Sequence, residues 1–165
     1  MVESLVREGE QSDHMIRRLV ILMALALLVG CCLRDVRWSG VRPPRGTKPT
    51  VVRLETTGYC PCQQCCGWKR NWYGKPVYAY GPRKGQRKQV GITASGLPAK
   101  HGTIAADTSV FPFGTVMYVP GYGYGVVEDR GGEIKGRHID LYFTHHDTAM
   151  KWGRKSKEVK VWPAK

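Results

Sequence analysis

Short runs of alternating apolar and polar residues, separated by glycines, characterise the chain after residue 50. Val52 and Leu54 alternate with Arg53 and Glu55, which predicts a half-buried strand. Further strands are predicted in "GTVMYVPGYGYGVVED", "GRHIDLYF" and "EVKVWP". The chain has 20 glycines and 10 prolines, so many turns must interrupt these strands. The pattern predicts a mainly β fold, a compact barrel of about six short strands.

Helical periodicity is scarce by comparison. The segment "DTAMKWGRK" predicts one short helix, with Asp147 as its N-cap and Gly153 as its end. The segment "CPCQQCCG" predicts a tight loop. Residues 68–90 are basic and aromatic without a clear period, which indicates an insertion loop between two parts of the barrel.

The N-terminal part of the chain has the pattern of a secretion leader. Arg17 and Arg18 precede an apolar run, Leu19 to Val29, that is too short to span a bilayer comfortably. The following "LVGC" resembles the bacterial lipobox, which makes Cys31 the candidate lipidation site. Residues 1–33 are therefore predicted to be a signal peptide, a lipoprotein leader or an uncleaved membrane anchor, and each of these places the remaining chain outside the cytoplasm.

Composition predicts a flexible linker before the folded domain and a net positive charge. Residues 34–50 are basic, contain prolines and have no periodicity, which predicts a flexible linker before a folded domain at 51–165. The net charge is +13, from 26 Lys and Arg against 13 Asp and Glu. An anionic partner is therefore expected, among cell-wall polymer, lipid headgroups and nucleic acid, although charge alone also serves solubility.

The strand around Asp140 is the first candidate for chemistry. Alternate side chains of a strand share a face, so Ile139 and Leu141 point one way while His138, Asp140 and Tyr142 point the other. This places a carboxyl between an imidazole and a phenol, as in the wall of a groove. An ordinary solvent-exposed strand face would show the same pattern.

Two further aspartates stand at predicted strand ends. Asp129 ends "VVED" before "RGG", and Asp107 ends "TIAAD" before "TSVFPFGT". Each of them is also a common type of turn or cap residue.

Several motifs in this order resemble the bacterial 3D (three-aspartate) domain: "GITASG", "GTIAAD", "FPFGTVMYVPGYG", "VVEDRGGEIKGRHIDLYF" and "WGRKSKEVKVW". The segment "EDRGGEIKGRHIDLYF" is also similar to the C-terminal part of membrane-bound lytic transglycosylase A. The resemblance implies a six-stranded double-psi β-barrel with one or two short helices, acting on peptidoglycan bound in a groove. It also implies that Asp140 is the single catalytic acid/base, with Asp129 and Asp107 as supporting carboxylates.

The implied reaction is cleavage of the MurNAc–GlcNAc β-1,4 bond with formation of 1,6-anhydroMurNAc. A general acid must still hold its proton near neutral pH, and burial or a neighbouring carboxylate raises the pKa of a carboxyl. Asp129 beside Asp140 would have that effect. One carboxyl can serve both steps, so neither a second nucleophile nor a cofactor is expected.

Several other residues are candidates for substrate binding. Thr93 and Ser95 of "TASG" carry small hydroxyls that could bond carboxylates or a sugar, although a simple turn explains them equally well. Lys135 would attract anionic stem peptides, although a solvated charge is commoner. His138 and Tyr142 flank Asp140 on its own face. Aromatic residues in 68–90 could stack on sugar rings or form a satellite core.

Four cysteines form a compact CxCxxCC motif: Cys60, Cys62, Cys65 and Cys66. An even local number of cysteines outside the cytoplasm favours disulfides. Zinc remains possible, but zinc sites usually draw ligands from two separated pairs, so disulfides are preferred and no metal is expected. The loop resembles one in some members of the 3D family, which supports a structural role.

The sequence therefore leads to three hypotheses about function. The first is a lytic transglycosylase of the cell envelope, a monomer whose partners are peptidoglycan glycan strands and, through the leader, a membrane. The second is a non-catalytic, expansin-like module that binds cell-wall polysaccharide. The third, nucleic-acid binding, fits the charge but not a secreted lipoprotein, so no nucleic-acid partner is expected.

Overall fold

The computed structural model of the chain describes residues 39–164. The predicted leader at 1–33, including Cys31, and the first residues of the predicted linker lie outside the described residues. Within residues 39–164, no helix has both the length and the apolar character needed to cross a bilayer.

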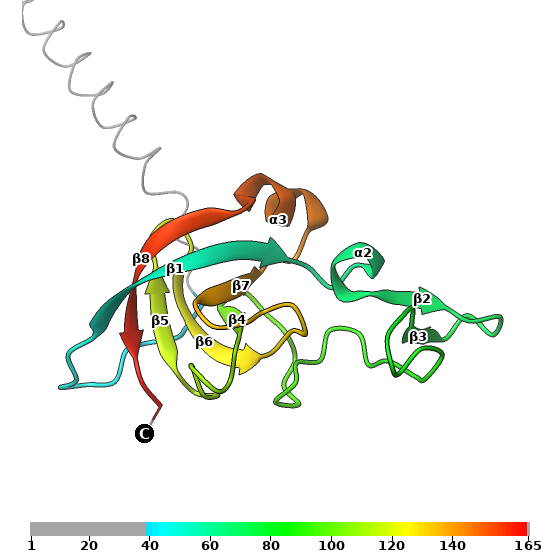
Figure 1. The fold of residues 1–165 in the computed structure, drawn as a ribbon, viewed down its shortest axis with the longest axis horizontal. Helices are drawn as coiled ribbons and strands as arrows, with labels where there is room; N and C mark the ends of the chain where they lie inside the picture. The colour runs from blue at the N-terminus through cyan, green and yellow to red at the C-terminus, as the bar shows by residue number, and fades with distance from the viewer. Residues whose placement is uncertain (1–38, 165) are drawn as a thin grey trace, which may run out of the picture. The chain divides into compact units, whose positions relative to one another are not determined.

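Six strands close into a barrel in the order β1-β7-β4-β6-β5-β8 (Figure 1). The pairs β1–β7 and β4–β6 are parallel, and the other pairs are antiparallel. The prediction of a mainly β fold with a six-stranded barrel and one or two short helices is confirmed. The barrel strands are β1 (Thr50–Tyr59), β4 (Thr103–Ala106), β5 (Val116–Val119), β6 (Gly123–Asp129), β7 (His138–Tyr142) and β8 (Lys155–Trp162).

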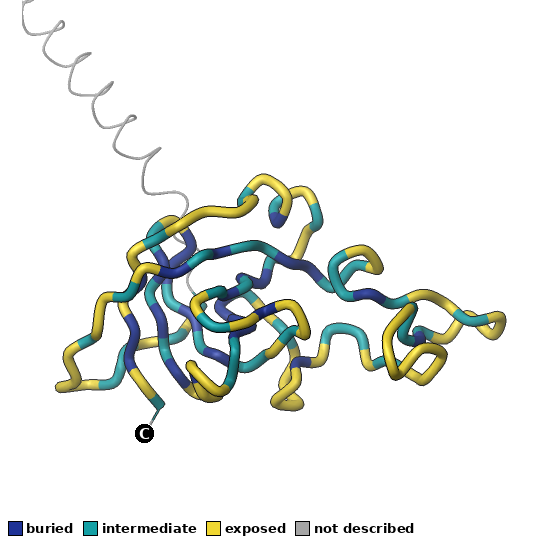
Figure 2. Tube along the Cα trace, viewed as in Figure 1, coloured by how far each residue is buried: buried dark blue, intermediate teal, exposed yellow. Residues whose placement is uncertain are grey.

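Alternation along the strands fills the inside of the barrel with apolar side chains. Leu54 of β1, Ile139 and Leu141 of β7 and Val159 of β8 are at most 1% exposed, as the strand pattern predicts. Figure 2 shows buried segments alternating with partly exposed ones along these strands. Tyr122, in the turn before β6, is also buried, and it packs edge-on against Phe143.

Residues 39–164 contain two helices, which are short and lie outside the barrel wall (Figure 1). Helix α3 (His146–Trp152) ends at Gly153 as predicted, but its N-cap is His145 rather than Asp147, which lies in the first turn. Helix α3 packs closely on β1 at Gly58, where an added Cβ would lie 2.9 Å from the Ala149 carbonyl oxygen. Any larger residue at this position would therefore push α3 away from the barrel.

The cysteine loop and the insertion contain more structure than the sequence indicates. Helix α2 (Gln63–Cys66) forms one turn, with Cys62 as its N-cap. Strands β2 (Trp68–Arg70) and β3 (Pro76–Tyr78) then pair as an antiparallel hairpin inside the predicted insertion loop. The Trp68 Nε1–H donates to the Pro61 carbonyl over 2.9 Å, which ties the hairpin to the cysteine loop.

The described part of the predicted linker hydrogen-bonds to the barrel. The Ser39 hydroxyl donates to the Tyr124 carbonyl over 2.6 Å, and the Trp162 indole donates to the Thr47 carbonyl over 3.0 Å. These bonds hold two points of residues 39–49 against strands β6 and β8.

Candidate functional site

Three adjacent barrel strands bring Asp140 and Asp129 to the same level of the wall. Asp140 on β7 pairs with Ala105 on β4, and Ala105 pairs with Asp129 on β6 after a register shift at Ile104. Because Ala105 ends at its Cβ, it leaves the space between the two carboxylates open. The carboxylates therefore lie two strands apart across a small residue.

Asp140 is partly buried and accepts a hydrogen bond from a side chain of the neighbouring strand β1. The Thr57 hydroxyl donates to its Oδ1 over 2.8 Å, and His138 Nε2 lies 2.8 Å from the same hydroxyl. Since the single hydroxyl proton goes to Asp140, the imidazole donates to Thr57. Burial raises the pKa of Asp140, with Asp129 contributing in the same direction, while the Thr57 bond and His138 oppose the shift.

Asp129 is held by donors from three different segments. The Tyr59 hydroxyl donates to its Oδ2 over 3.0 Å, and the Ala94 and Arg130 amides each donate to its Oδ1 over 2.9 Å. These bonds are of the type that stabilises an ionised carboxylate. Asp129 therefore provides a fixed negative charge near Asp140.

Asp107 has a different environment from the other two aspartates. Its Oδ2 accepts from the Gly136 amide over 2.9 Å, and its Oδ1 accepts from the Ser109 amide and hydroxyl. The Gly136 bond, followed by the Ser109 bonds, lowers the pKa of Asp107 to about 2. Asp107 thus fastens the segment before β7, and it is not among the residues that line the groove described below.

We expect Asp107→Asn to remove part of the acid sensitivity of the fold. The pKa of Asp107 is about 2 when folded, against an ordinary value of 3.8, so its carboxylate stabilises the fold fully above pH 3.8. That contribution is lost as the pH falls through about 2. Thermal unfolding followed by circular dichroism across this window should show a smaller loss of Tm in the variant than in wild type.

The matched control for this prediction is Glu158→Gln, a change at an exposed carboxylate on β8. Its ion pair with Arg53 is solvent-exposed and contributes little. Equal acid sensitivity in Asp107→Asn and wild type would show that the Gly136 and Ser109 bonds do not hold the segment.

An open groove of about 900 Å³ lies over the paired carboxylates. Asp140, Ala105 and Asp129 of the barrel line one part of it, with Tyr59 from the end of β1. Four basic residues from the insertion and the β6–β7 loop also line it, together with Glu133 and uncharged residues: Arg83, Arg87, Lys88 and Arg130. The groove thus combines two carboxylates with a cationic rim, an arrangement suited to an anionic polymer.

The "TASG" turn contacts the site through its backbone and not through its hydroxyls. Thr93 is buried, and its hydroxyl donates to the Leu97 carbonyl and lies 3.0 Å from the Ser95 hydroxyl. The Ala94 amide is the group that reaches Asp129. Thr93 lines the groove while Ser95 is not among the lining residues, so the structure gives the Ser95 hydroxyl no contact with the carboxylates.

The other predicted substrate-binding residues occupy supporting positions. Lys135 is exposed on the segment before β7, and His138 donates to Thr57 beneath Asp140. Tyr142 is only 6% exposed and packs edge-on against Tyr59. Tyr142 is therefore a support for the Tyr59 ring and not a groove surface, because the strand end on which it lies is covered.

Sequence reasoning missed the two residues that hydrogen-bond the carboxylates from β1. Thr57 and Tyr59 continue the alternation that starts with Arg53 and Glu55, so they lie on the polar face of that strand. The alternation along β1 could therefore have indicated that Thr57 and Tyr59 face the same side as Arg53 and Glu55. The pairing of β1 with β7 was not visible, because a parallel pair between the first and fifth barrel strands leaves no local trace in the sequence.

The four cysteines lie beside the groove as free thiols. Cys60 Sγ and Cys65 Sγ are 3.7 Å apart, whereas a disulfide bond measures about 2.05 Å. The structure thus differs from the disulfide expectation of the sequence analysis. Cys65 and Cys66 line the groove next to Tyr59.

Comparison with known proteins agrees with the resemblance noted in the sequence. The family model described as "3D domain" matches residues 102–164, which include all three aspartates. The resemblance to this family is therefore confirmed over residues 102–164, which contain the five barrel strands from β4 to β8.

Two proteins of Bacillus subtilis (strain 168) are similar over 75 residues each, 43% of this chain. One is the "Putative cell wall shaping protein YabE", 39% identical, and the other is the "Cell wall-binding protein YocH", 40% identical. The aligned stretch spans 18% of YabE and 26% of YocH, so most of each relative has no counterpart in the alignment.

Crystal structures of MltA from Escherichia coli are similar over part of the chain. One aligns at 26% identity over 44% of this chain and 28% of that chain, with a TM-score of 0.37. Another, MltA with bound chitohexaose, aligns at 23% identity over 48% and 30%, with a TM-score of 0.39.

Proposed function

We propose that the chain is a peptidoglycan lytic transglycosylase with Asp140 as its single acid/base. The observation that supports this most is the environment of Asp140. Its carboxyl lines an open groove, is held by Thr57 and has a pKa raised by burial. A carboxyl that retains its proton in contact with substrate is what cleavage of a glycosidic bond requires.

In the proposed reaction, protonated Asp140 gives its proton to the glycosidic oxygen between MurNAc and GlcNAc. The C1–O bond breaks, the GlcNAc hydroxyl leaves, and positive charge develops at C1 of MurNAc. The Asp140 carboxylate then removes the proton from the C6 hydroxyl of the same MurNAc. That oxygen attacks C1, which closes the 1,6-anhydro ring and returns Asp140 to its protonated form.

Asp129 supports both steps as a fixed charge. Its carboxylate accepts hydrogen bonds from Tyr59, Ala94 and Arg130, so it remains in place as the charge at C1 develops. Its negative charge also contributes to the raised pKa of Asp140. The basic rim of the groove would attract the carboxylates of stem peptides.

The test is mass spectrometry of muropeptides released from purified peptidoglycan by the full-length chain and by Asp140→Asn. Anhydro-muropeptides from wild type but not from Asp140→Asn would support the proposal. Glu158→Gln, a change outside the groove lining, should match wild type. Reducing-end products would identify hydrolysis by water. An absence of products from wild type would contradict the enzyme proposal.

The names of the Bacillus relatives favour a second candidate, a module that binds cell-wall polysaccharide without cleaving it. The groove and its cationic rim would suffice for that role. Retention of wild type and Asp140→Asn on peptidoglycan with equal affinity, and no released product from either, would favour this candidate. With either function we propose a monomer in the cell envelope, anchored by the leader and Cys31.

We expect Thr57→Val to move the pH dependence of the reaction toward higher pH. The Thr57 hydroxyl bonds the ionised form of Asp140 and so lowers its pKa, and loss of this bond raises the pKa further. Because the reaction needs the protonated acid, the rate should then persist to higher pH. Initial rates of anhydro-muropeptide release across a pH series measure the shift.

Thr57→Ser is the matched control, because it keeps the hydroxyl and removes only a methyl group. Its pH profile should coincide with that of wild type. A profile of Thr57→Val that does not move, or that moves to lower pH, would show that Asp140 is not the group that titrates.

A further inference from the structure

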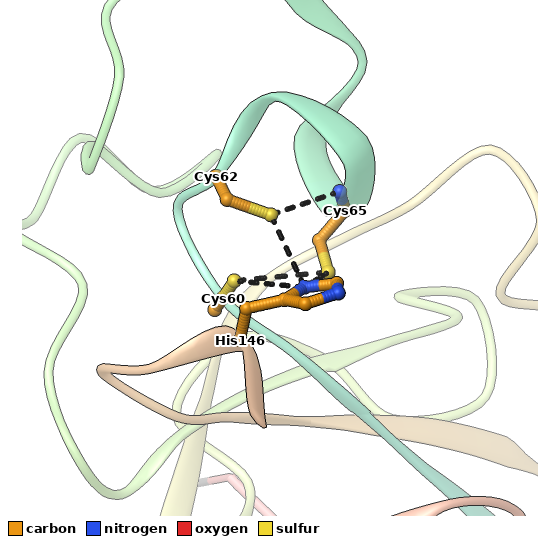
Figure 3. Close-up of side chains that lie close together, drawn as sticks. All are labelled: Cys60, Cys62, Cys65 and His146. Carbon is orange, nitrogen blue, oxygen red and sulfur yellow. Dashed lines mark hydrogen bonds between the residues drawn. The ribbon is translucent and has the colours of Figure 1, made fainter. Parts of the chain in front are cut away.

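Four ligand-type side chains from two distant parts of the chain converge beside the groove (Figure 3). Cys60 directly follows β1, Cys62 caps α2 and Cys65 lies within α2. The fourth residue, His146, begins α3, more than 80 positions later in the sequence. In Figure 3 the three sulfur atoms and the imidazole point toward a common centre.

Four of the six distances between these atoms match those of a tetrahedral metal site. His146 Nδ1 lies 3.5 Å from Cys62 Sγ, 3.6 Å from Cys65 Sγ and 3.8 Å from Cys60 Sγ. Cys60 Sγ and Cys65 Sγ are 3.7 Å apart, and all four ligand atoms lie within 4.8 Å of one another. Tetrahedral zinc, with Zn–S near 2.3 Å and Zn–N near 2.05 Å, places sulfurs about 3.8 Å apart and S and N about 3.6 Å apart.

The chemistry of the donors selects the metal. Three thiolates and one imidazole form a soft, compact set that suits zinc and offers calcium or magnesium no oxygen ligand. The Cys65 amide donates to Cys62 Sγ over 3.4 Å, and a bond of this kind orients a thiolate ligand. Because all four ligands come from the protein, the site leaves no position for substrate or water.

We propose that Cys60, Cys62, Cys65 and His146 bind one Zn²⁺ as a closed structural site. Zinc ligands often come from two CxxC-type pairs, and here the second pair is replaced by one cysteine upstream and a histidine from α3. The expectation of disulfides rested on the even number of cysteines outside the cytoplasm, and zinc was set aside because a second pair was missing. The fold supplies the fourth ligand by packing α3 against β1.

The position of this site gives it a defined structural task. It joins the loop after β1 to the first residue of α3, the helix that follows β7. Strands β1 and β7 are the two that carry Tyr59 and Asp140. Cys65 and Cys66 line the groove, and Tyr59, adjacent to Cys60, donates to Asp129. Zinc would therefore hold one wall of the groove, independently of what the groove binds.

The first test is metal content of the full-length chain, purified in detergent without chelators and carrying Cys31→Ser and Cys32→Ser. These two changes remove the thiols outside the described residues. Elemental analysis should find one zinc per chain. Cobalt(II) exchanged for zinc should give the intense visible bands and thiolate charge-transfer absorption of a tetrahedral sulfur-rich site.

Variants then assign the ligands. His146→Gln should weaken zinc binding by at least about 100-fold in competition with a chromophoric chelator, because it removes a direct ligand. His145→Gln changes the exposed neighbouring histidine, and Cys66→Ser changes the cysteine whose thiol donates to the Cys60 carbonyl. Both controls should retain one zinc per chain with the affinity of the parent.

Thermal unfolding measures the effect of zinc on the parent protein, with its four proposed ligands unchanged. Saturating zinc added to chelator-treated parent protein should raise Tm by about 10 °C when free zinc is near a thousandfold above Kd. The same addition should leave His146→Gln much less stabilised.

Three outcomes would overturn the proposal. One is a parent chain without zinc whose mass is lower by two hydrogens for each disulfide, which would establish the disulfide alternative. Another is zinc that binds His146→Gln as tightly as the parent, which would remove the histidine from the site. The third is a cobalt spectrum without thiolate charge transfer, which would show an adventitious surface metal.

Discussion

Asp140→Asn is expected to lower the rate of anhydro-muropeptide release by about 10²- to 10⁴-fold, the range typical for loss of a general acid–base group. Asparagine keeps the size of the side chain and can still accept from Thr57, so the groove should retain its shape. It can neither donate a proton to the glycosidic oxygen nor remove one from the C6 hydroxyl. Initial rates on purified peptidoglycan, with equal substrate binding verified by sedimentation, measure the loss.

The pH profile separates a lost catalyst from a damaged groove. The wild-type rate should fall as the pH rises through the raised pKa of Asp140, above the ordinary 3.8 of an aspartate. Residual activity of Asp140→Asn should lack this fall. If Asp140→Asn retained wild-type rates, or if its residual activity showed the same fall, Asp140 would not be the acid.

The second large effect is expected on stability, at Tyr122. Tyr122 is only 1% exposed. Its hydroxyl accepts a hydrogen bond from the Gly102 amide and donates one to the Tyr142 carbonyl, each over 2.9 Å. Tyr122→Phe leaves both backbone groups without this partner and should cost about 2 kcal/mol. Tyr122→Ala adds a cavity beneath Phe143 and Trp152 and should cost at least about 4 kcal/mol.

Urea unfolding followed by tryptophan fluorescence measures both free energies of unfolding. Tyr124→Phe is the matched control: Tyr124 is only partly buried, so its change should lie within about 0.5 kcal/mol of wild type. A Tyr122→Phe variant as stable as wild type would show that water or another group replaces the hydroxyl. If Tyr122→Phe and Tyr122→Ala lowered the free energy of unfolding equally, the whole effect would come from the two hydrogen bonds and none from the cavity.

Local patterning was sufficient to predict most of the barrel. The alternation around Leu54 and Ile139 gave the correct inward faces of β1 and β7, because burial of one strand face imposes a period of two on the sequence. Gly153 correctly ended α3, because glycine readily takes the positive φ found there. The N-cap of α3 was wrong by two residues, since cap preference at Asp147 was weaker than the packing of the turn before it.

The candidate site was predictable only in part, because local patterning gives the direction of a side chain but not its contacts. That Asp140 faces away from Ile139 and Leu141 follows from strand alternation, and the ordered motifs of the 3D domain pointed to the same three aspartates. That Tyr142 is covered, and that the Ser95 hydroxyl turns away from the carboxylates, depends on what packs over each residue. Local sequence carries no record of such contacts.

The sequence by itself determined the strand faces, the order of the motifs and the chemical nature of the groups available. Tertiary structure alone decided which of those groups meet. Parallel pairing of β1 with β7 brings Thr57 to Asp140, and the β7–β4–β6 order sets Asp129 two strands away across Ala105. The packing of α3 on β1 carries His146 to the three cysteines. The physical reason is that side-chain direction is set by the local backbone, whereas contacts between distant segments are set by barrel closure and burial of the shared core.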